Sequence, residues 1–262
     1  MNKVSQTWSA YPSPQIDGRM RMMVLPQLKS WVLIPSAMLA LVLAVGFGAM
    51  YLPGYTTGEL AVDQEISRHH DTLLNGMALL LSTAFSPFGG GILLAAICLF
   101  LLLVRRSPVN AIGFGAVASV SWLSSQVFKV VVERPRPNPA LLADPLAPET
   151  GFDSFPSGHV SLAVGLAFAL YYLARGTRWR NAAAILGAAM VVALALSRIY
   201  IGVHYPTDVA AAVVTASATV MLFSGLWNRH AARLLARLRF LERFGPIPLE
   251  SHRDRHRVGI QR

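Results

Sequence analysis

The sequence predicts an all-α, polytopic membrane protein, and three observations favour this fold class. Only 14% of the 262 residues are charged, against roughly 25% in soluble domains. Hydrophobic residues make up 54% of the chain. They form long runs without a formal charge, and several runs reach the ~20 residues that a helix needs to cross a bilayer. These runs cover residues 30–58, 72–104, 107–128, 154–174, 181–197 and 209–228.

Six transmembrane helices are expected from these runs. The first run is too long to be the core of a cleaved signal peptide, so it is taken as the first crossing. The single cysteine, Cys98, lies inside an apolar run and is expected to be a small packed residue. The expected crossings are residues 31–53, 87–104, 108–130, 158–174, 181–200 and 206–227.

An amphipathic helix is expected between the first two crossings. The run 72–104 is interrupted by the sequence SPFGGG at residues 86–91. Its first half is about 15 residues, or roughly 22 Å of helix, which is shorter than the ~30 Å core of a bilayer. Polar Asn75 and Ser82 fall on one face of this half, and apolar Met77 and Leu80 fall on another. We therefore expect residues 66–85 to lie in the membrane interface.

The net charge of +10 indicates orientation rather than nucleic-acid binding. Basic residues cluster before the first crossing, in two short turns (105–106 and 175–180) and in the tail after Asn228. If these segments face the cytoplasm, few cations remain outside, which is the positive-inside pattern of membrane proteins. Both termini would then be cytoplasmic. The basic residues left on the outer side are Arg68, Lys129, Arg134, Arg136 and Arg198.

The expected organisation is one membrane domain with two flanking segments. Residues 1–30 are expected to be a cytoplasmic segment, 31–227 the six-helix domain and 228–262 a basic cytoplasmic tail. Arg229, Arg233 and Arg237 recur every fourth residue beside leucines. This spacing predicts a basic amphipathic helix, either resting on anionic headgroups or serving only as a topology anchor. Disorder is expected beyond Pro246.

Three short stretches far apart in the sequence are predicted to meet at the outer ends of the crossings. They are KVVVERPRP at 129–137, FPSGH at 155–159 and SRIYIGVHYPTD at 197–208. Lys129, Arg136 and Arg198 are costly at the ends of apolar helices, and such cations are commonly functional. Because no matching number of carboxylates accompanies them in these stretches, we expect them to bind an anion with several oxygens, such as a phosphate.

The start of the crossing at residue 158 is a second candidate element of this anion site. Backbone N–H groups and the positive end of the helix dipole meet at Ser157 and Gly158. Glycine there allows the backbone to approach a ligand closely. The plainer interpretation is a turn in which Ser157 caps the helix.

Two histidines and an aspartate complete the candidate site. His204 and Asp208 are four residues apart, so they lie on one face if a helix begins near Pro206. A carboxylate that accepts a hydrogen bond from one ring nitrogen leaves the other nitrogen free to attack. His159 then has the complementary task of donating a proton to the leaving-group oxygen. Each motif alone also fits capping or packing, and their expected convergence favours function.

The three motifs together resemble the type 2 phosphatidic acid phosphatase family. They match in order as Lys, six residues, Arg-Pro; then Pro-Ser-Gly-His; then Ser-Arg, five residues, His, three residues, Asp. The resemblance implies a phosphate held by five residues, a phosphohistidine formed on His204, Asp208 as its orienter and His159 as general acid. It implies no metal or other cofactor. The implied phosphate-binding residues are Lys129, Arg136, Arg198, Ser157 and Gly158.

The resemblance implies a lipid phosphatase whose partners are a membrane lipid and the bilayer, without nucleic acid. It does not indicate an oligomeric state. We expect a multi-pass protein of a bacterial cytoplasmic (inner) membrane, with its site facing the periplasm or exterior. Undecaprenyl diphosphate is the favoured substrate. Phosphatidic acid, phosphatidylglycerol phosphate and a lipid A phosphate are alternatives, because the motifs read the phosphate and not the tail.

Three other functions compete with hydrolysis. A phosphotransferase would pass the phosphohistidine to a lipid acceptor, with residues 138–155 or the outer helix binding the second substrate. A vanadate-dependent peroxidase shares this anion site, but those relatives are soluble. A lipid-binding or transport protein with a degenerate site is disfavoured by the complete set of His159, His204 and Asp208. Glu133 and Arg134 have no assigned role beyond an ion pair or headgroup contacts.

Overall fold

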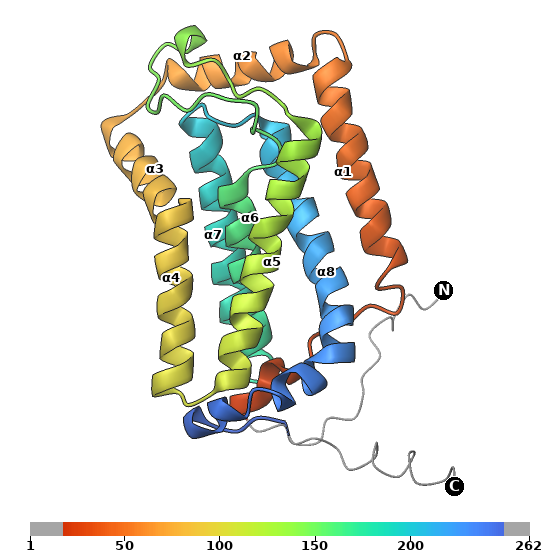
Figure 1. Ribbon diagram of the computed structural model, residues 1–262. Helices are drawn as coiled ribbons and strands as arrows, with labels where there is room; N and C mark the ends of the chain where they lie inside the picture. Colours follow the sequence, from red (N-terminus) through yellow and green to blue (C-terminus); the bar gives the residue numbers. More distant parts are fainter. Residues whose placement is uncertain (1–17, 249–262) are drawn as a thin grey trace, which may run out of the picture.

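A computed structural model describes residues 18–248, and the described chain is all helical. Its long helices stand side by side in one bundle (Figure 1). The α-helices are α1 (Leu33–Tyr51), α2 (Tyr55–Ser67), α3 (Thr72–Ala84), α4 (Pro87–Leu99), α5 (Pro108–Val132), α6 (Gly158–Ala174), α7 (Arg180–Tyr200) and α8 (Pro206–Ala236). Four shorter helices accompany them: η1 (Gly18–Met23), η2 (Phe100–Val104), η3 (Pro139–Leu141) and η4 (Arg239–Phe244).

The bundle is built around α6. This helix packs against α5, α7 and α8, and small and apolar residues such as Ala163, Leu166 and Ala169 are buried along it. Within the described chain, five helices (α1, α4 with η2, α5, α7 and α8) are long and apolar enough to cross a membrane. The fold is therefore an all-helical, multi-pass membrane protein, as predicted. The sixth expected crossing is α6, which is apolar but has 17 residues, so a count of six remains a prediction.

The helix breaks follow from local sequence. Asp71 precedes α3, and its carboxylate accepts hydrogen bonds from the N–H groups of Leu73 and Leu74. Ser86 precedes α4, and its hydroxyl accepts from the N–H of Gly89 at 3.0 Å. Proline occupies the first turn of α4, α5 and α8, where a missing N–H costs nothing.

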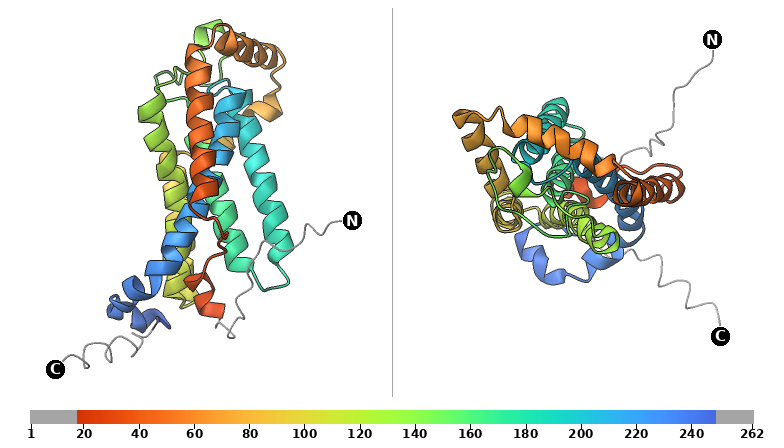
Figure 2. Two further views of the ribbon diagram at one scale, coloured as in Figure 1. Left: turned by 90° about the vertical axis from the view of Figure 1, so that its right-hand side faces the viewer. Right: turned by 90° about the horizontal axis from the view of Figure 1, so that it is seen from above.

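The prediction of one interfacial helix over 66–85 is wrong in its extent. The chain forms two helices, α2 and α3, with a turn between Ser67 and Thr72. Viewed from above, α2 lies across the end of the bundle (Figure 2). Sequence reasoning missed α2 because its mixture of acidic and apolar residues carries no clear stripe, and it placed the start of α3 too early because Asp71 is a cap rather than a helical residue.

The predicted sidedness of α3 is confirmed. The hydroxyl of Tyr200 on α7 donates to the side-chain oxygen of Asn75 at 2.7 Å, and Ser82 accepts a hydrogen bond from Arg198. Leu73, Met77 and Leu80 on the opposite face are exposed. The polar face of α3 is therefore turned towards the bundle.

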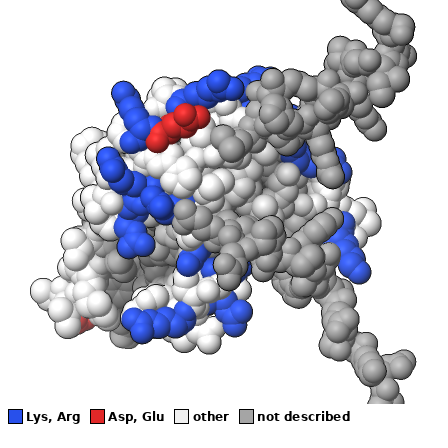
Figure 3. Space-filling model, turned by 90° about the horizontal axis from the view of Figure 1, so that it is seen from below, with Lys and Arg blue, Asp and Glu red and all other residues white. Residues whose placement is uncertain are grey.

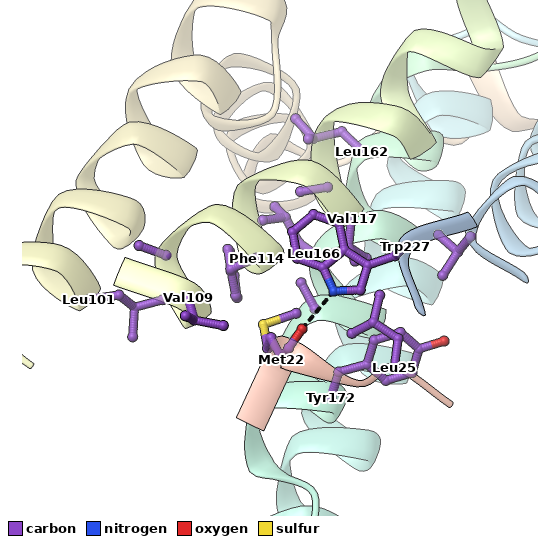
Figure 4. Close-up of a cluster of buried hydrophobic side chains, with 14 of the residues drawn as sticks. Met22, Leu25, Leu101, Val109, Phe114, Val117, Leu162, Leu166, Tyr172 and Trp227 are labelled. Atoms are coloured by element: carbon purple, nitrogen blue, oxygen red, sulfur yellow. Dashed lines mark hydrogen bonds between the residues drawn. The ribbon is translucent and has the colours of Figure 1, made fainter. Parts of the chain in front are cut away.

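The chain before α1 packs into the opposite end of the bundle. Met22 and Leu25 are buried in the main hydrophobic cluster, and the indole N–H of Trp227 donates to the C=O of Met22 at 2.8 Å (Figure 4). Asn110 of α5 accepts from the N–H of Met22 at 2.9 Å. Asn228 of α8 accepts from the N–H of Leu25 at 2.8 Å and donates to its C=O at 2.9 Å. Residues 18–25 are thus part of the packed structure.

The last helix is longer than expected. α8 continues to Ala236, beyond the predicted end at residue 227, and Ala231 and Leu235 are buried on it. The predicted basic helix is therefore the end of α8, where the guanidinium of Arg229 lies 4.8 Å from the ring centre of Trp31. The division into segments 1–30, 31–227 and 228–262 remains a prediction, and the disorder expected in the tail falls largely on residues outside those described.

Basic residues surround the end of the bundle that carries the described ends of the chain. A view of this end shows many Lys and Arg side chains and few acidic ones (Figure 3). The segment before α1 and the end of α8 both lie there, while α2 and the turn between α7 and α8 lie at the other end (Figure 1). The structure therefore has a basic end and an opposite end, here called the outer end.

Asn228→Leu is expected to destabilise the protein because it leaves the N–H and C=O of Leu25 without partners. The expected loss is about 1–3 kcal/mol, seen as a lower midpoint of thermal unfolding in detergent. Asn181→Leu changes an exposed asparagine and serves as the control. Equal midpoints for the two variants would contradict a stabilising role for the two hydrogen bonds between Asn228 and Leu25.

Asp63 on α2 generates a second prediction. Its side chain is 1% exposed, and neither carboxylate oxygen has a hydrogen-bond partner among residues 18–248. Burial, followed by the nearby Asp208 and Glu59, raises the pKa of Asp63 from 3.8 to about 8. The folded protein thus keeps a proton that the unfolded chain releases between these two pH values, so this residue lowers the free energy of unfolding as pH rises through that window.

Asp63→Asn removes this penalty and is expected to raise the midpoint of thermal unfolding more at pH 8 than at pH 5. The difference arises from a penalty of up to about 1.4 kcal/mol per pH unit. Glu65→Gln on the same helix, where the side chain is 60% exposed, is measured alongside as the control. If the unfolding midpoint of Asp63→Asn shifts equally at both pH values, the prediction that folded Asp63 keeps its proton is wrong.

Candidate active site

The three sequence motifs meet at the outer end of the bundle. Consecutive long helices run in opposite directions, so the end of α5, the start of α6, the end of α7 and the start of α8 lie together. Lys129 lies in the last turn of α5, His159 in the first turn of α6 and Arg198 in the last turn of α7. His204 lies in the turn before α8, and Asp208 lies in the first turn of α8. The predicted convergence is confirmed.

His204 and Asp208 form a buried pair. The Nδ1 of His204 lies 3.5 Å from an Asp208 carboxylate oxygen, and the two side chains are 1% and 0% exposed. This separation is long for a hydrogen bond, and no other described residue bonds to Nδ1. The ring therefore lies beside the carboxylate without a short hydrogen bond to it.

The Asp208 carboxylate is fixed by donors on both oxygens. One oxygen accepts from the hydroxyl of Ser154 and, at 2.9 Å, from the N–H of Tyr205. The other accepts from Arg134 at 2.7 Å. The bond to Tyr205 also caps α8, so the capping interpretation of Asp208 is confirmed, and its role as the orienter of His204 stays a prediction. The carboxylate is at once a cap and the neighbour of His204.

The opposite nitrogen of His204 faces the cations. Its Nε2 lies 3.3 Å from the Nη1 of Arg136. Burial, followed by Arg136, Arg198 and Lys129, holds the pKa of His204 well below its usual range. The imidazole is therefore neutral at neutral pH. With its proton on Nδ1, beside Asp208, the lone pair of Nε2 points towards the cation cluster.

Two carboxylates from outside the motifs accompany the three cations, which is still fewer than a matching number. Arg136 pairs with Asp153 at 2.8 Å and with Glu149 at 2.8 Å. Glu149 also pairs with Arg198 at 2.8 Å, and Lys129 pairs with Asp153 at 3.1 Å. Both acids belong to the chain between α5 and α6, which sequence reasoning treated as a loop without a role in the cation site.

Both acids are ionised at neutral pH. Although partial burial opposes ionisation, the ion pairs of Glu149 with Arg198 and Arg136 hold its pKa below its usual value. The hydrogen bond from Arg136, aided by Lys129, holds the pKa of Asp153 well below its usual value against the effect of burial. Three cations therefore face two carboxylates.

The start of α6 points its free N–H groups into the same region. The first bond of the helix runs from the N–H of Ser161 to the C=O of Ser157, so the N–H groups of Gly158, His159 and Val160 have no acceptor within the helix. The N–H of Ser157 is already used, since it donates to the C=O of Asp208 at 3.1 Å. The Ser157 hydroxyl is buried and has no hydrogen-bond partner in the described part of the chain.

The residues around position 158 leave room for a Cβ atom, so they do not require glycine there. A Cβ atom there would meet Gln126, Ser125 and Trp122 at 3.5–3.6 Å, which is ordinary contact. The predicted close approach of a ligand to this backbone therefore stays a prediction.

His159 lies on the far side of the cation cluster, against α3. Its Nε2 is 3.2 Å from the C=O of Ser82, and the Ser82 hydroxyl accepts from Arg198. Sequence reasoning missed Ser82, Glu149, Asp153 and Ser154 as site residues. A signal existed only for Ser82, which belongs to the polar face of α3, because the acids and Ser154 reach the site through a loop whose path the motifs do not determine.

Comparison with known proteins supports the family that the three motifs resemble. Residues 108–231 match the PAP2 superfamily, and this range contains all three motifs. The undecaprenyl-diphosphatase BcrC of Bacillus subtilis is 28% identical over 155 residues, which cover 59% of this chain and 76% of that protein. An undecaprenyl-diphosphatase of Sulfolobus acidocaldarius is 31% identical over 144 residues, covering 53% of this chain and 63% of that protein.

A solved structure shares the fold. The crystal structure of a transmembrane PAP2-type phosphatidylglycerolphosphate phosphatase from Bacillus subtilis matches with a TM-score of 0.59 at 21% identity. The match covers 76% of this chain and 96% of that one. These matches support the predicted resemblance: the chain carries a PAP2 superfamily domain over residues 108–231, in an all-helical fold shared with a solved transmembrane PAP2-type protein.

Proposed function

We propose that this protein is a lipid phosphatase that works through a phosphohistidine on His204. The observation that carries the proposal is the environment of this side chain. His204 is buried and neutral, has Asp208 beside Nδ1 and presents Nε2 to Arg136 at 3.3 Å. A neutral imidazole with one nitrogen oriented by a carboxylate and the other facing an anion site is suited to nucleophilic attack.

The reaction follows from the positions of the groups. Arg136, Arg198 and Lys129 hold the phosphate oxygens, together with the N–H groups at the start of α6. The Nε2 lone pair of His204 attacks phosphorus, and the bond from phosphorus to the leaving oxygen breaks. His159 gives its proton to that oxygen.

The second half of the reaction reverses the role of His159. It takes a proton from water, whose oxygen attacks phosphorus, and the bond from phosphorus to Nε2 breaks. Inorganic phosphate leaves and His204 is restored. Asp208 stabilises the positive charge that the imidazole carries while it is phosphorylated.

We favour undecaprenyl diphosphate as the substrate. Both curated relatives described above are named undecaprenyl-diphosphatases, and three cations suit a headgroup with several negative charges. Phosphatidic acid, phosphatidylglycerol phosphate and lipid A phosphates remain alternatives, as does transfer of the phosphate to a lipid acceptor. The basic residues at the opposite end support a site that faces the periplasm or exterior of a bacterial cytoplasmic membrane, with cytoplasmic termini.

His204→Ala is expected to reduce phosphate release by at least about 10³-fold, because the covalent route is lost. Purified protein in detergent is assayed with chelator against undecaprenyl diphosphate, phosphatidic acid, phosphatidylglycerol phosphate and a lipid A. His69→Ala, which changes a histidine that is 72% exposed at the outer end, is the control. Wild-type rates for His204→Ala would rule out the nucleophile, and release from no lipid would favour the transferase.

His159→Ala is expected to harm poor leaving groups most, because general acid catalysis contributes about 10²–10⁴-fold where the departing oxygen needs a proton. Phosphatidic acid loses an alkoxide, whereas undecaprenyl diphosphate loses a more stable phosphate oxygen. The ratio of kcat for these two lipids is measured in wild type, His159→Ala and His69→Ala. Equal losses on both lipids in His159→Ala would contradict the acid role.

A further inference from the structure

Arg134 is a buried cation that binds the Asp208 carboxylate on the oxygen that does not face His204. Its side chain is 0% exposed, as is that of Asp208. Its Nη1 donates to the Asp208 oxygen that does not face His204, at 2.7 Å, and to the hydroxyl of Thr207 at 2.8 Å. The guanidinium also lies 4.1 Å from the ring centre of Tyr205. The motif comparison assigned this residue no function.

The second half of the Arg134 guanidinium is held by α2. Its Nη2 donates to Glu59 at 2.6 Å. Glu59 in turn accepts from both the N–H and the hydroxyl of Thr207 at 2.8 Å. The four side chains Glu59, Arg134, Thr207 and Asp208 therefore form one connected network between α2 and the first turn of α8.

Arg134 and Arg136 have opposite tasks although only Pro135 separates them. In a regular strand, residues two apart share one face, so the different contacts of the two arginines reflect the irregular backbone that follows α5. Arg136 contacts Glu149, Asp153 and the Nε2 side of His204. Arg134 contacts the far side of Asp208. One arginine thus faces the reacting phosphate and the other faces away from it.

The electrostatics explain why a cation is needed behind Asp208. A buried carboxylate without a counter-charge is costly. His204 cannot supply that charge before reaction, because it is neutral. Arg134 supplies it instead, so Asp208 can be ionised before the imidazole becomes positive. Glu59 in turn fixes the orientation of Arg134.

We propose that Arg134, held in place by Glu59 of α2, is a positioning residue that keeps Asp208 charged and correctly oriented beside His204. This inference rests on the proposed function of His204. It gives α2, which lies outside the PAP2 domain match, a part in the reaction. The competing explanation is that the network only fastens α2 to the bundle, in which case it contributes stability and nothing to turnover.

The test compares kcat, KM and inhibition by orthophosphate in purified, folded variants. Arg134→Lys keeps the charge but cannot reach both Asp208 and Glu59 with a planar fork. Its kcat is expected to fall about 10–100-fold, the loss typical of orienting partners behind metal ligands. Arg134→Gln is expected to fall further, and Glu59→Gln by less than Arg134→Lys. KM and the orthophosphate inhibition constant should change by no more than about 2-fold, since the phosphate ligands are untouched.

Arg68→Lys and Glu65→Gln are matched controls. Their side chains form an ion pair at the same end of the molecule, and each is 60% exposed. Both should behave as wild type. Each kcat is expressed per folded molecule, with folding followed by thermal unfolding. If Arg134→Gln fails to fold, Glu59→Gln and Arg134→Lys decide the question.

Wild-type kcat in Arg134→Lys and Glu59→Gln, with only a lower unfolding midpoint, would overturn the positioning role. So would a loss confined to KM. Failure of the proposed function gives a different result: the wild-type protein itself then shows no phosphate release that depends on His204.

Discussion

Backbone N–H and C=O groups cannot be left unpaired in hydrocarbon, and this constraint determines where chemistry can occur in this protein. The chain satisfies it with helices, so irregular backbone and charged side chains collect where helices end. α5, α6, α7 and α8 follow one another in alternating directions. Two motifs at helix ends and one in the turn before α8 are therefore brought together without any strand or separate domain in the described chain.

Asp208 joins these helix ends more directly than any other residue of the site. Its backbone C=O accepts from Ser157 at the start of α6, and its carboxylate accepts from Ser154, Tyr205 and Arg134. It thus ties the loop before α6, the segment after α5 and the start of α8 to one point. A residue that sequence reasoning chose as the orienter of a histidine is also the main structural link of the outer end.

The fold was largely predictable because lipid exposure leaves a strong compositional signal. Five of the expected crossings appear as long apolar helices, and the sidedness of α3 could be read from Asn75 and Ser82. α2 was not predictable, since a helix that lies across the bundle and buries Asp63 and Ser67 has no apolar run. The end of α8 was misplaced because arginines among its last turns resemble a separate tail helix.

The site was predictable where spacing along a helix or a motif sets the geometry, as for His204 and Asp208. Its partners from elsewhere were not. Glu149 and Asp153 reach the cations through a loop of variable path, and Glu59 reaches Arg134 from a helix that had not been recognised. Long-range ion pairs of this kind depend on the folded backbone, which local patterns do not specify.

The break between α3 and α4 has a consequence for His159, the proposed general acid. In an unbroken helix, the C=O of Ser82 would accept from the N–H four residues later, that of Ser86. At the break, the N–H of Ser86 bonds instead to Thr83, and the carbonyl of Ser82 is released to face the Nε2 of His159. The interruption at Ser86 and Pro87 therefore does more than shorten a helix: it frees a backbone acceptor that lies against the imidazole of His159.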